Sequence, residues 1–185
     1  MTGPEIFARL VARFPSAGLS ASEGGVPSIV VPTAALVDVA MFLRDDPDLA
    51  FDYPASFTAI DYMEQFEVVY QLRSIGLRHD VNLKSRVDRA SATLPSLVSV
   101  WRGADFQERE IFDLMGITFD GHPDLRRILL WDEFVGHPLR KDYALPAPMP
   151  PAVEAAFRAG GVAAANIVGR VVPGPRALDG DGVSA

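Results

Sequence analysis

The stretch Phe66-Glu-Val-Val-Tyr-Gln-Leu-Arg73, followed after a short gap by Asp80-Val-Asn-Leu-Lys-Ser-Arg-Val87, decides the fold. In the first run apolar side chains alternate with polar ones except at Val69, and in the second the alternation is almost unbroken, with Ser85 at one of the otherwise apolar positions. A period of two is that of a β-strand with one buried and one solvated face. The residues between the runs, Ser74–Gly76, fit a hairpin turn. With Phe57–Tyr62 before them, the runs predict a three-stranded antiparallel meander.

The residues before the meander predict two helices and one short strand. Thr2-Gly-Pro-Glu5 has the spacing of a capping box and opens an apolar stripe that ends at Phe14. A loop is expected over 18–25, and Ser28–Val31 is expected to form a short buried strand. Thr33 is expected to cap a second helix, which stops before Pro47 because the residue before proline avoids the helical region. The predicted order is α-β-α-β-β-β, an α+β fold of two layers with the helices on one face of a mixed, largely antiparallel sheet.

The pattern changes after Pro95. Asp105-Phe-Gln-Glu108 is a second capping box, and the apolar stripe that follows it predicts a helix closed by Gly116. Beyond Asp120 regular periodicity fades into ordered irregular structure. The expected organisation is therefore a sheet domain over residues 1–94, a helix with a charged segment packed on it over 95–143, and a Pro/Gly-rich extension over 144–185.

Composition excludes several classes of function. The chain has 17 Lys and Arg against 24 Asp and Glu, a formal charge of −7, which disfavours nonspecific binding to nucleic acid. It has no cysteine, which excludes disulfides, thiolate zinc sites, a cysteine nucleophile and the usual ligands of iron–sulfur clusters. We therefore expect no redox centre held by this polypeptide alone.

The sequence contains no stretch with the pattern of a targeting or membrane-spanning segment. The start of the chain lacks the cationic and apolar regions of a secretory signal, and the longest weakly polar stretches are about ten residues, too short to span a bilayer. Membrane contact is expected only through a partner. A chain that starts at Met1 without a transit peptide favours a bacterial source.

The densest charged cluster is Glu108-Arg109-Glu110 with Asp113. On a helix Glu110 and Asp113 share a face, and Arg109 can reach Asp113 four residues on. Paired carboxylates could act as acid and base or bind a hard cation, the latter together with His122. The plainer interpretation is a buried or interfacial ion network, with Arg126 and Arg127 as partners.

Two further groups of residues allow more than one interpretation. His122 and His137 both stand in a Gly-His-Pro setting, where each imidazole could ligate a metal or bond a backbone carbonyl or carboxylate in a rigid turn. His79 is expected at the surface. Arg140 and Lys141 could bind phosphate or dock on an acidic partner surface, and we favour docking because Asp142 follows them.

Together these residues resemble a known family. The run Trp101-Arg-Gly-Ala-Asp-Phe-Gln-Glu-Arg-Glu-Ile-Phe-Asp-Leu-Met-Gly-Ile-Thr-Phe-Asp-Gly-His-Pro123 is similar to the signature of the C subunit of proton-pumping NADH:quinone oxidoreductase, respiratory complex I. The similarity continues through Leu125-Arg-Arg-Ile-Leu129 and Gly136-His-Pro-Leu-Arg-Lys-Asp-Tyr143, and covers roughly residues 5 to 145. Phe106 and Phe134 stand where the family pattern has tryptophan.

The resemblance implies a component of the hydrophilic arm without a cofactor of its own. Electrons would pass from NADH through FMN and iron–sulfur clusters in other subunits to quinone, coupled to proton translocation. The partners would be the large D subunit at the quinone site, with the B and I subunits nearby, at the cytoplasmic face of the bacterial inner membrane. The extension over 144–185 lies outside the resemblance, and that it wraps a neighbouring subunit is a separate hypothesis. Implied signature and interface residues are Glu108, Arg109, Glu110, Asp113, Gly116, His122, Pro123, Arg126, Arg127, His137, Arg140, Lys141 and Asp142.

Two alternatives remain open. One is the equivalent subunit of a related membrane-bound hydrogenase or ferredoxin-driven complex, in which this subunit looks alike. The other is a free-standing metal-dependent enzyme built on Glu110, Asp113 and His122.

Overall fold

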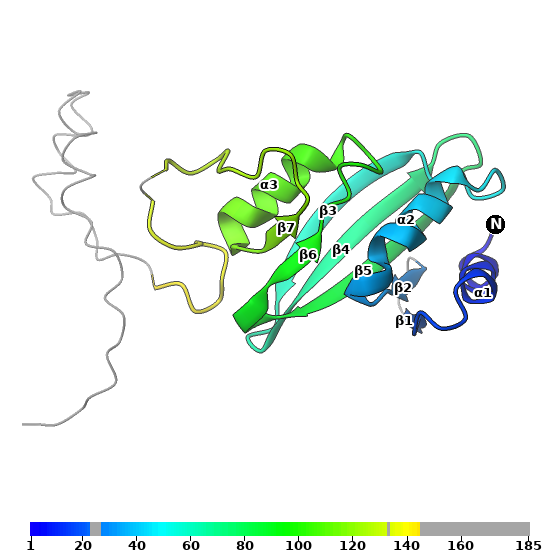
Figure 1. Cartoon of the computed structure of the whole chain (residues 1–185), viewed down its shortest axis with the longest axis horizontal. Coiled ribbons are helices and arrows are strands. Elements are labelled where there is room, and N and C mark those ends of the chain that lie inside the picture. The colour runs from blue at the N-terminus through cyan, green and yellow to red at the C-terminus, as the bar shows by residue number, and fades with distance from the viewer. Residues whose placement is uncertain (23–26, 133, 145–185) are drawn as a thin grey trace, which may run out of the picture.

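The predicted meander forms the centre of a five-stranded sheet in the computed structural model, which describes residues 1–22, 27–132 and 134–144 (Figure 1). Its three strands are β3 (Tyr53–Asp61), β4 (Gln65–Ser74) and β5 (His79–Asp88). They pair antiparallel, with Tyr70 opposite both Phe57 and Leu83. The prediction of the meander is confirmed.

Two short strands extend the sheet beyond β5. The strand β2 (Ser28–Val30) pairs parallel with β5, and β1 (Ser20–Ser22) pairs antiparallel with β2. The strand order is β1-β2-β5-β4-β3, so the sheet is mixed and largely antiparallel, as predicted. The loop predicted over 18–25 is wrong for β1, because three small residues carry no periodicity that could reveal a strand.

The first two helices follow the prediction except for one cap. The helix α1 (Gly3–Arg13) begins after Thr2, whose N–H donates to Glu5 Oε2 at 2.6 Å, so the capping box is confirmed. The helix α2 (Leu36–Asp45) ends where predicted, but Thr33 does not cap it. Instead a 3₁₀ turn, η1 (Thr33–Ala35), leads directly into α2. This turn is closed by a backbone hydrogen bond from Ala35 N–H to Pro32 O.

The hydrophobic core lies between the helices and one face of the meander. Phe66, Val68, Tyr70 and Leu72 of β4 are at most 1% exposed and alternate as the sequence predicts. Glu67 points to the opposite face, yet it too is 1% exposed, because Arg86 at 2.7 Å and Lys84 at 3.8 Å cover its carboxylate. The outer face of the sheet is therefore polar but not evenly solvated.

The third helix, α3 (Ala104–Met115), lies over the β3 side of the sheet (Figure 1). A 3₁₀ turn, η2 (Arg89–Ser91), leads into β6 (Thr93–Pro95), which pairs parallel with β7 (Thr118–Asp120) in a small second sheet. Because β6 precedes α3 and β7 follows it, the pairing of these two strands brings together the chain before the helix and the chain after it. Gln107 Oε1 of α3 accepts from Phe57 N–H at 2.6 Å and so satisfies one amide on the free edge of β3. Residues 145–185, most of the predicted extension, lie outside the described residues.

Candidate interaction site

The charged segment after α3 is built around the carboxylate of Asp113. Its side chain is fully buried, and Oδ2 accepts the N–H groups of residues 128, 129 and 130 at 2.8–3.1 Å. Arg127 Nη1 donates to Oδ1 at 3.0 Å. Burial alone would raise the pKa of Asp113, but the three amides and the guanidinium outweigh it and hold that pKa below its ordinary value. Asp113 therefore fixes the backbone of residues 128–130, which lie 15 to 17 positions after it in the sequence.

The C-terminus of α3 is capped by a second part of the same segment. Gly116 ends the helix in the left-handed conformation with φ 70°, which confirms the predicted stop. Four successive carbonyls, of residues 113 to 116, then accept from His137 Nδ1 at 2.9 Å, Leu139 N at 3.1 Å, Arg140 Nε at 2.6 Å and Arg140 Nη2 at 3.1 Å. A helix end leaves these acceptors unpaired, and a guanidinium there also suits the helix dipole.

His137 acts in this cap as a neutral ring. Burial lowers the pKa of His137, and the nearby guanidinium groups of Arg140 and Arg127 act in the same direction. Because its partner is the carbonyl oxygen of Asp113, Nδ1 must carry the proton. The bond to a backbone carbonyl is one of the two roles that the Gly-His-Pro setting predicts.

A third anchor ties the end of the segment to the sheet. Asp61, at the end of β3, accepts from the guanidinium of Arg89 and from Lys141 N–H at 2.9 Å. Arg89 also pairs with Asp142, and the guanidinium groups of Arg89 and Arg140 both lie over the ring of Phe66, 5.1 and 5.3 Å from its centroid. Residues 61 and 141 thus meet although 80 positions separate them in the sequence.

Acid should weaken this anchor. Burial raises the pKa of Asp61, but the hydrogen bonds from Arg89, Lys141 and Met63 outweigh it and set that pKa below its ordinary value. A carboxyl with a lowered folded-state pKa stabilises the fold above its unfolded pKa of about 3.9, and that contribution is lost as the pH falls through the folded value. Urea midpoints of the full chain at about pH 5 and about pH 3 should therefore fall less on acidification for Asp61→Asn than for the wild type. Asp38→Asn, which changes an exposed acid of α2, is the control, and its urea midpoint should fall as much as that of the wild type. If the midpoints of Asp61→Asn and Asp38→Asn fell equally, Asp61 would not be the source of the acid sensitivity.

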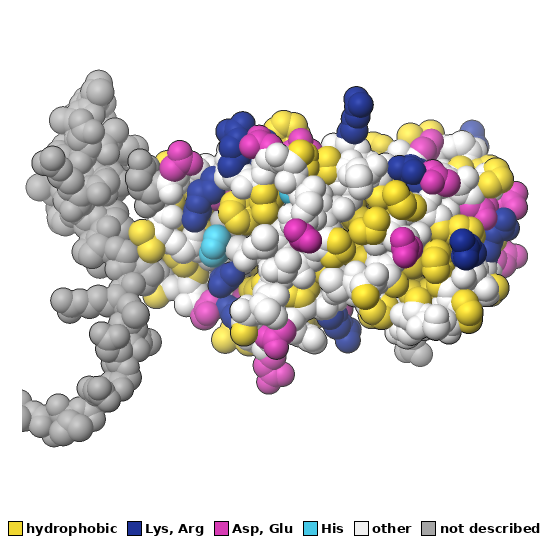
Figure 2. Space-filling model, in the orientation of Figure 1, with side chains coloured by type: hydrophobic (Ala, Val, Ile, Leu, Met, Phe, Trp, Pro, Cys, Tyr) yellow, Lys and Arg dark blue, Asp and Glu magenta, His cyan; other side chains and the backbone are white. Residues whose placement is uncertain are grey.

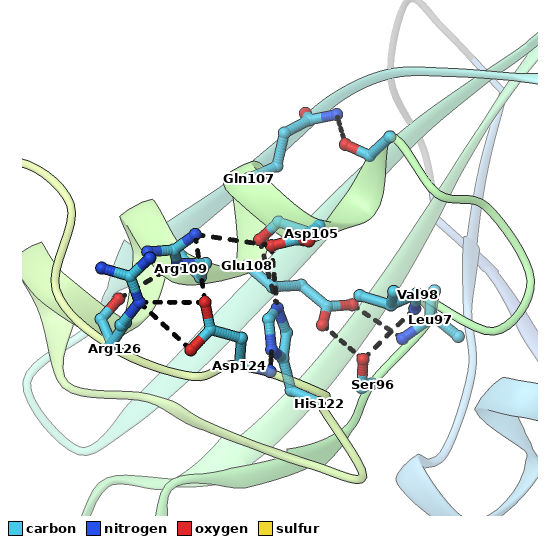
Figure 3. Close-up of polar contacts among 11 residues, drawn as sticks. Ser96, Leu97, Val98, Asp105, Gln107, Glu108, Arg109, His122, Asp124 and Arg126 are labelled. Carbon is cyan, nitrogen blue, oxygen red and sulfur yellow. Dashed lines mark hydrogen bonds and ion pairs between the residues drawn. The ribbon is translucent and has the colours of Figure 1, made fainter.

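Glu108 does not form the predicted capping box. Its side chain enters the core instead, where Oε1 accepts from Leu97 N–H at 2.7 Å and Oε2 from the Ser96 hydroxyl at 2.6 Å (Figure 3). The helix begins after Gly103, earlier than the box requires, which turns Glu108 onto the inner face. Burial raises the pKa of Glu108 to about 7, and the Asp105 carboxylate adds to the effect.

The ion pairs of α3 also differ in part from the prediction. Arg127 pairs with Asp113 as predicted, but Arg109 does not reach Asp113. Arg109 lies 3.8 Å from both Asp105 and Asp124 and donates from Nε to the backbone oxygen of Arg126, while the Arg126 side chain pairs with Asp124 at 2.9 Å (Figure 3). The reason is helical position: Asp113 faces residues 127–130, and Arg109 faces the turn around residue 124.

The residues proposed for a metal enzyme do not converge. Glu110 is exposed, Asp113 is used by four donors, and the buried His122 ring bonds Asp105 O at 3.2 Å through Nε2 and accepts Asp124 N–H at Nδ1. No group of three or more His, Cys, Asp or Glu suited to a metal ion occurs among the described residues. His122 thus fills the structural role that its Gly-His-Pro123 turn predicts.

The charged run Arg140-Lys141-Asp142 does not act as one unit. Arg140 and Asp142 are both engaged within the chain, the first at the end of α3 and the second with Arg89. The Lys141 side chain is exposed and has no hydrogen bond or ion pair among the described residues. The docking role predicted for Arg140 and Lys141 stays a prediction, and the structure adds that the Arg140 guanidinium already binds carbonyls at the end of α3.

Four residues of these contacts were not predicted from the sequence. Asp61, Arg89 and Ser96 carry no local motif, and their partners lie 12 to 80 positions away. His79, expected at the surface, is 6% exposed, donates from Nε2 to Leu49 O at 2.7 Å and packs on Phe51. The signal for His79 was present, since it continues the inward alternation of β5.

Comparison with known proteins identifies the family. The profile of "Respiratory-chain NADH dehydrogenase, 30 Kd subunit" matches residues 29–149, about two thirds of the chain, including α3 and the whole segment described above. The chain belongs to this family. A relative from Roseiflexus castenholzii, named as the C subunit of NADH-quinone oxidoreductase, is 45% identical over 151 residues, which span 80% of this chain and 87% of the relative. The protein of the same name from Moorella thermoacetica is 45% identical over 130 residues, 69% of this chain and 86% of that protein.

Solved structures agree with this membership. A trypsin-resistant fragment of Nqo5 aligns with a TM-score of 0.55 and 27% identity, covering 65% of this chain and 99% of the fragment. A chain of the archaeal membrane-bound sulfane sulfur reductase, a respiratory membrane complex, aligns with a TM-score of 0.62 over 84% of this chain and 91% of that one. At 22% identity the latter shows a shared fold alone. Among the described residues no helix is long and apolar enough to cross a bilayer.

Proposed function

We propose that this chain is the C subunit of an NADH:quinone oxidoreductase, in which it holds no cofactor and supports the assembly of the subunits that do. Electrons would pass from NADH through FMN and iron–sulfur clusters in those other subunits to quinone, with proton translocation coupled to the transfer. Family membership supports this assignment, as does the absence of cysteine from the whole sequence.

The observation that carries the proposal is an apolar surface on the segment held by α3. Leu129, Trp131, Val135 and Leu139 are each more than half exposed, at 61, 52, 51 and 59%. We call these four residues the C-terminal apolar surface. Four large apolar side chains, each more than half exposed within eleven residues, favour a site of protein contact.

The backbone beneath this surface is already fixed. Asp113 holds residues 128–130, and the cap of α3 holds residues 137–140. Trp131 packs edge-on against Phe134 at 5.0 Å between centroids, and Phe134 stacks on Tyr143 at 6.1 Å. A surface fixed before binding loses little conformational entropy on association, and a half-exposed tryptophan is a common anchor of such interfaces.

The partners follow from the family. We infer contact with the large D subunit at the quinone site, with the B and I subunits nearby, at the cytoplasmic face of a bacterial inner membrane that the chain meets only through the complex. On the face seen in Figure 2, cationic and anionic side chains are interspersed, which fits a mixed protein interface better than a nucleic-acid surface.

Shortening the tryptophan should weaken assembly. Trp131→Ala should lower the amount of chain recovered in the assembled complex at least about tenfold in competition with wild type, because it removes an anchor and leaves the fold intact. The measurement is native purification of the tagged chain from mild-detergent extracts, with mass spectrometry of the co-purifying chains. Ile75→Ala is the matched control, since Ile75 is 60% exposed on the β4–β5 turn and lies outside the C-terminal apolar surface. Equal recovery of both variants would contradict the proposed surface.

The same purification tests the alternative. The fold shared with the sulfane sulfur reductase complex is compatible with the equivalent subunit of a related membrane-bound complex, such as a hydrogenase or a ferredoxin-driven enzyme. The co-purifying chains and the presence or absence of flavin would separate it from an NADH-driven complex. Recovery as a colourless free 20.0-kDa protein at normal abundance would overturn both.

A further inference from the structure

Glu108 differs from the other buried carboxylates of the chain. Asp61, Glu67 and Asp113 are each paired with an arginine, respectively Arg89, Arg86 and Arg127. Glu108 is 0% exposed and has no ion pair with any Lys, Arg or His of the described residues. An ionised carboxylate without a counter-ion is costly in a protein core, whereas the protonated acid is not.

Within residues 1–22, 27–132 and 134–144, the polar groups around Glu108 are neutral or negative. The loop before α3 contributes the Ser96 hydroxyl and the Leu97 amide, and β4 contributes the Tyr70 hydroxyl, whose own pKa burial raises well above its ordinary value. One helical turn back along α3 lies the carboxylate of Asp105. In Figure 3 the Glu108 side chain points toward Ser96 and Leu97 and away from the guanidinium groups of Arg109 and Arg126.

The positive groups near this cluster all face Asp105 or Asp124 instead. Arg109 lies 3.8 Å from Asp105, and His122 Nε2 lies 3.6 Å from it on the side of the β7 turn. They leave Glu108 with a negative neighbour, which acts on its pKa in the same direction as burial.

The inner face also holds unpaired polar atoms. Tyr70 Oη and Ser85 Oγ are buried and make no hydrogen bond, and they lie on adjacent strands, since Ser85 of β5 pairs with Val68 of β4. A carboxylate can only accept, and Glu108 already accepts two hydrogen bonds. A carboxylic acid adds a donor, which an unpaired hydroxyl oxygen in the same core can accept.

We propose that Glu108, buried without a counter-ion among the described residues, is a proton-binding site in the core, and that loss of its proton loosens α3 from the strand layer. Because α3 carries Asp113 and the helix end capped by His137 and Arg140, loosening it also loosens the C-terminal apolar surface. Binding of a proton at Glu108 thus favours the docking-competent form, and this last consequence rests on the proposed function.

The sign of the effect follows from the shift itself. The folded-state pKa of about 7 lies above the ordinary value of 4.5, so the stabilising effect is complete below pH 4.5 and is lost as the pH rises through about 7. With these two values, the opening equilibrium of α3 should increase roughly 30-fold between about pH 5.5 and about pH 8. Above that range it should stay level.

Amide hydrogen exchange of α3 in the full chain measures this directly. After division by the intrinsic rates, the amides of residues 108–115 should open roughly 30-fold more often at about pH 8 than at about pH 5.5 in the wild type. Glu108→Gln, which keeps the shape without the charge, should vary less than about twofold over the same range. Glu110→Gln, on the exposed face of the same helix, should behave as the wild type. A wild type that shows no increase, or a Glu108→Gln chain that retains it, would overturn the proton site.

A second arm separates this inference from the proposed function. Recovery of wild type and Glu108→Gln chains in the assembled complex is compared at about pH 6 and about pH 8. Wild-type recovery should fall at the higher pH while that of Glu108→Gln does not, and equal pH responses would overturn the link between Glu108 and docking. Failure of the chain to assemble at either pH would refute the proposed function, whereas the exchange experiment on the free chain would still decide on the proton site.

Discussion

Replacing Asp113 with alanine should destabilise the full chain by about 3–5 kcal/mol, the largest loss expected of any single change in the charged segment. The side chain is fully buried, and four donors depend on it: three backbone amides and the guanidinium of Arg127. Alanine removes the acceptor of all four donors at once. It also leaves the Arg127 guanidinium, whose side chain is only 17% exposed, without its carboxylate partner. Such uncompensated groups account for the greatest losses that point mutations cause.

Urea unfolding and amide exchange together check this prediction. The unfolding midpoint should drop, and the amides of residues 128–130 should lose their protection even under conditions in which the sheet remains folded. Glu110→Ala is the matched control, because it removes a carboxylate from the exposed face of the same helix and should change stability by less than about 0.5 kcal/mol. If Asp113→Ala kept the amides of 128–130 protected, then Asp113 would not organise this segment.

The meander could be predicted because its information is local. The alternation in β4 and β5 depends only on neighbours two residues apart, and Gly116 ends α3 for a reason that lies in its own backbone. The ion pair at Asp113 was predictable in part, since Arg127 has the opposite charge and stands in the charged stretch that follows α3. The acceptance of three backbone amides was not, because any residue except proline offers the same amide.

What could not be predicted is held by long-range contacts. Asp61 meets Lys141 across 80 residues, and nothing near either position indicates the pairing. The hydrogen bond between Glu108 and Ser96 could not be predicted for another reason. Residues 105–108 have the sequence of a capping box, but the helix starts earlier, and Glu108 therefore lies on its inner face. Boundaries of helices shift by a residue or two, and here such a shift separates a surface acid from a buried one.

The signature charges are therefore mostly internal. Asp113, Arg127 and Arg140 are used to hold an irregular segment against α3, and this explains why a stretch without regular periodicity is ordered. The C-terminal apolar surface and Lys141, by contrast, are exposed. In the proposed function, the ion pairs and hydrogen bonds hold the segment in place, and the exposed apolar side chains would contact the neighbouring subunit.

Gly116→Ala should separate the segment from the helix end. A Cβ atom at this position would lie 2.4 Å from Arg140 Nη2 and 2.5 Å from the His137 ring. The arginine could swing away, but His137 is held by its bond to the carbonyl of Asp113 and cannot move without losing it. The left-handed backbone, with φ 70°, adds strain for any residue with a side chain. We expect a loss of about 2–4 kcal/mol, with the amide of Leu139 among the first to exchange.

Gly121→Ala distinguishes strain from crowding in this prediction. Gly121 has a comparable φ of 78°, but a Cβ atom there would have no neighbour within 4 Å. Its substitution should therefore carry only the backbone cost of about 1 kcal/mol, and it should leave the cap of α3 intact. The difference between the two unfolding free energies measures how tightly residues 137–140 close on the helix end. A difference near zero would mean that the cap yields freely, and Arg140 and His137 would then not fix the surface that the neighbour meets.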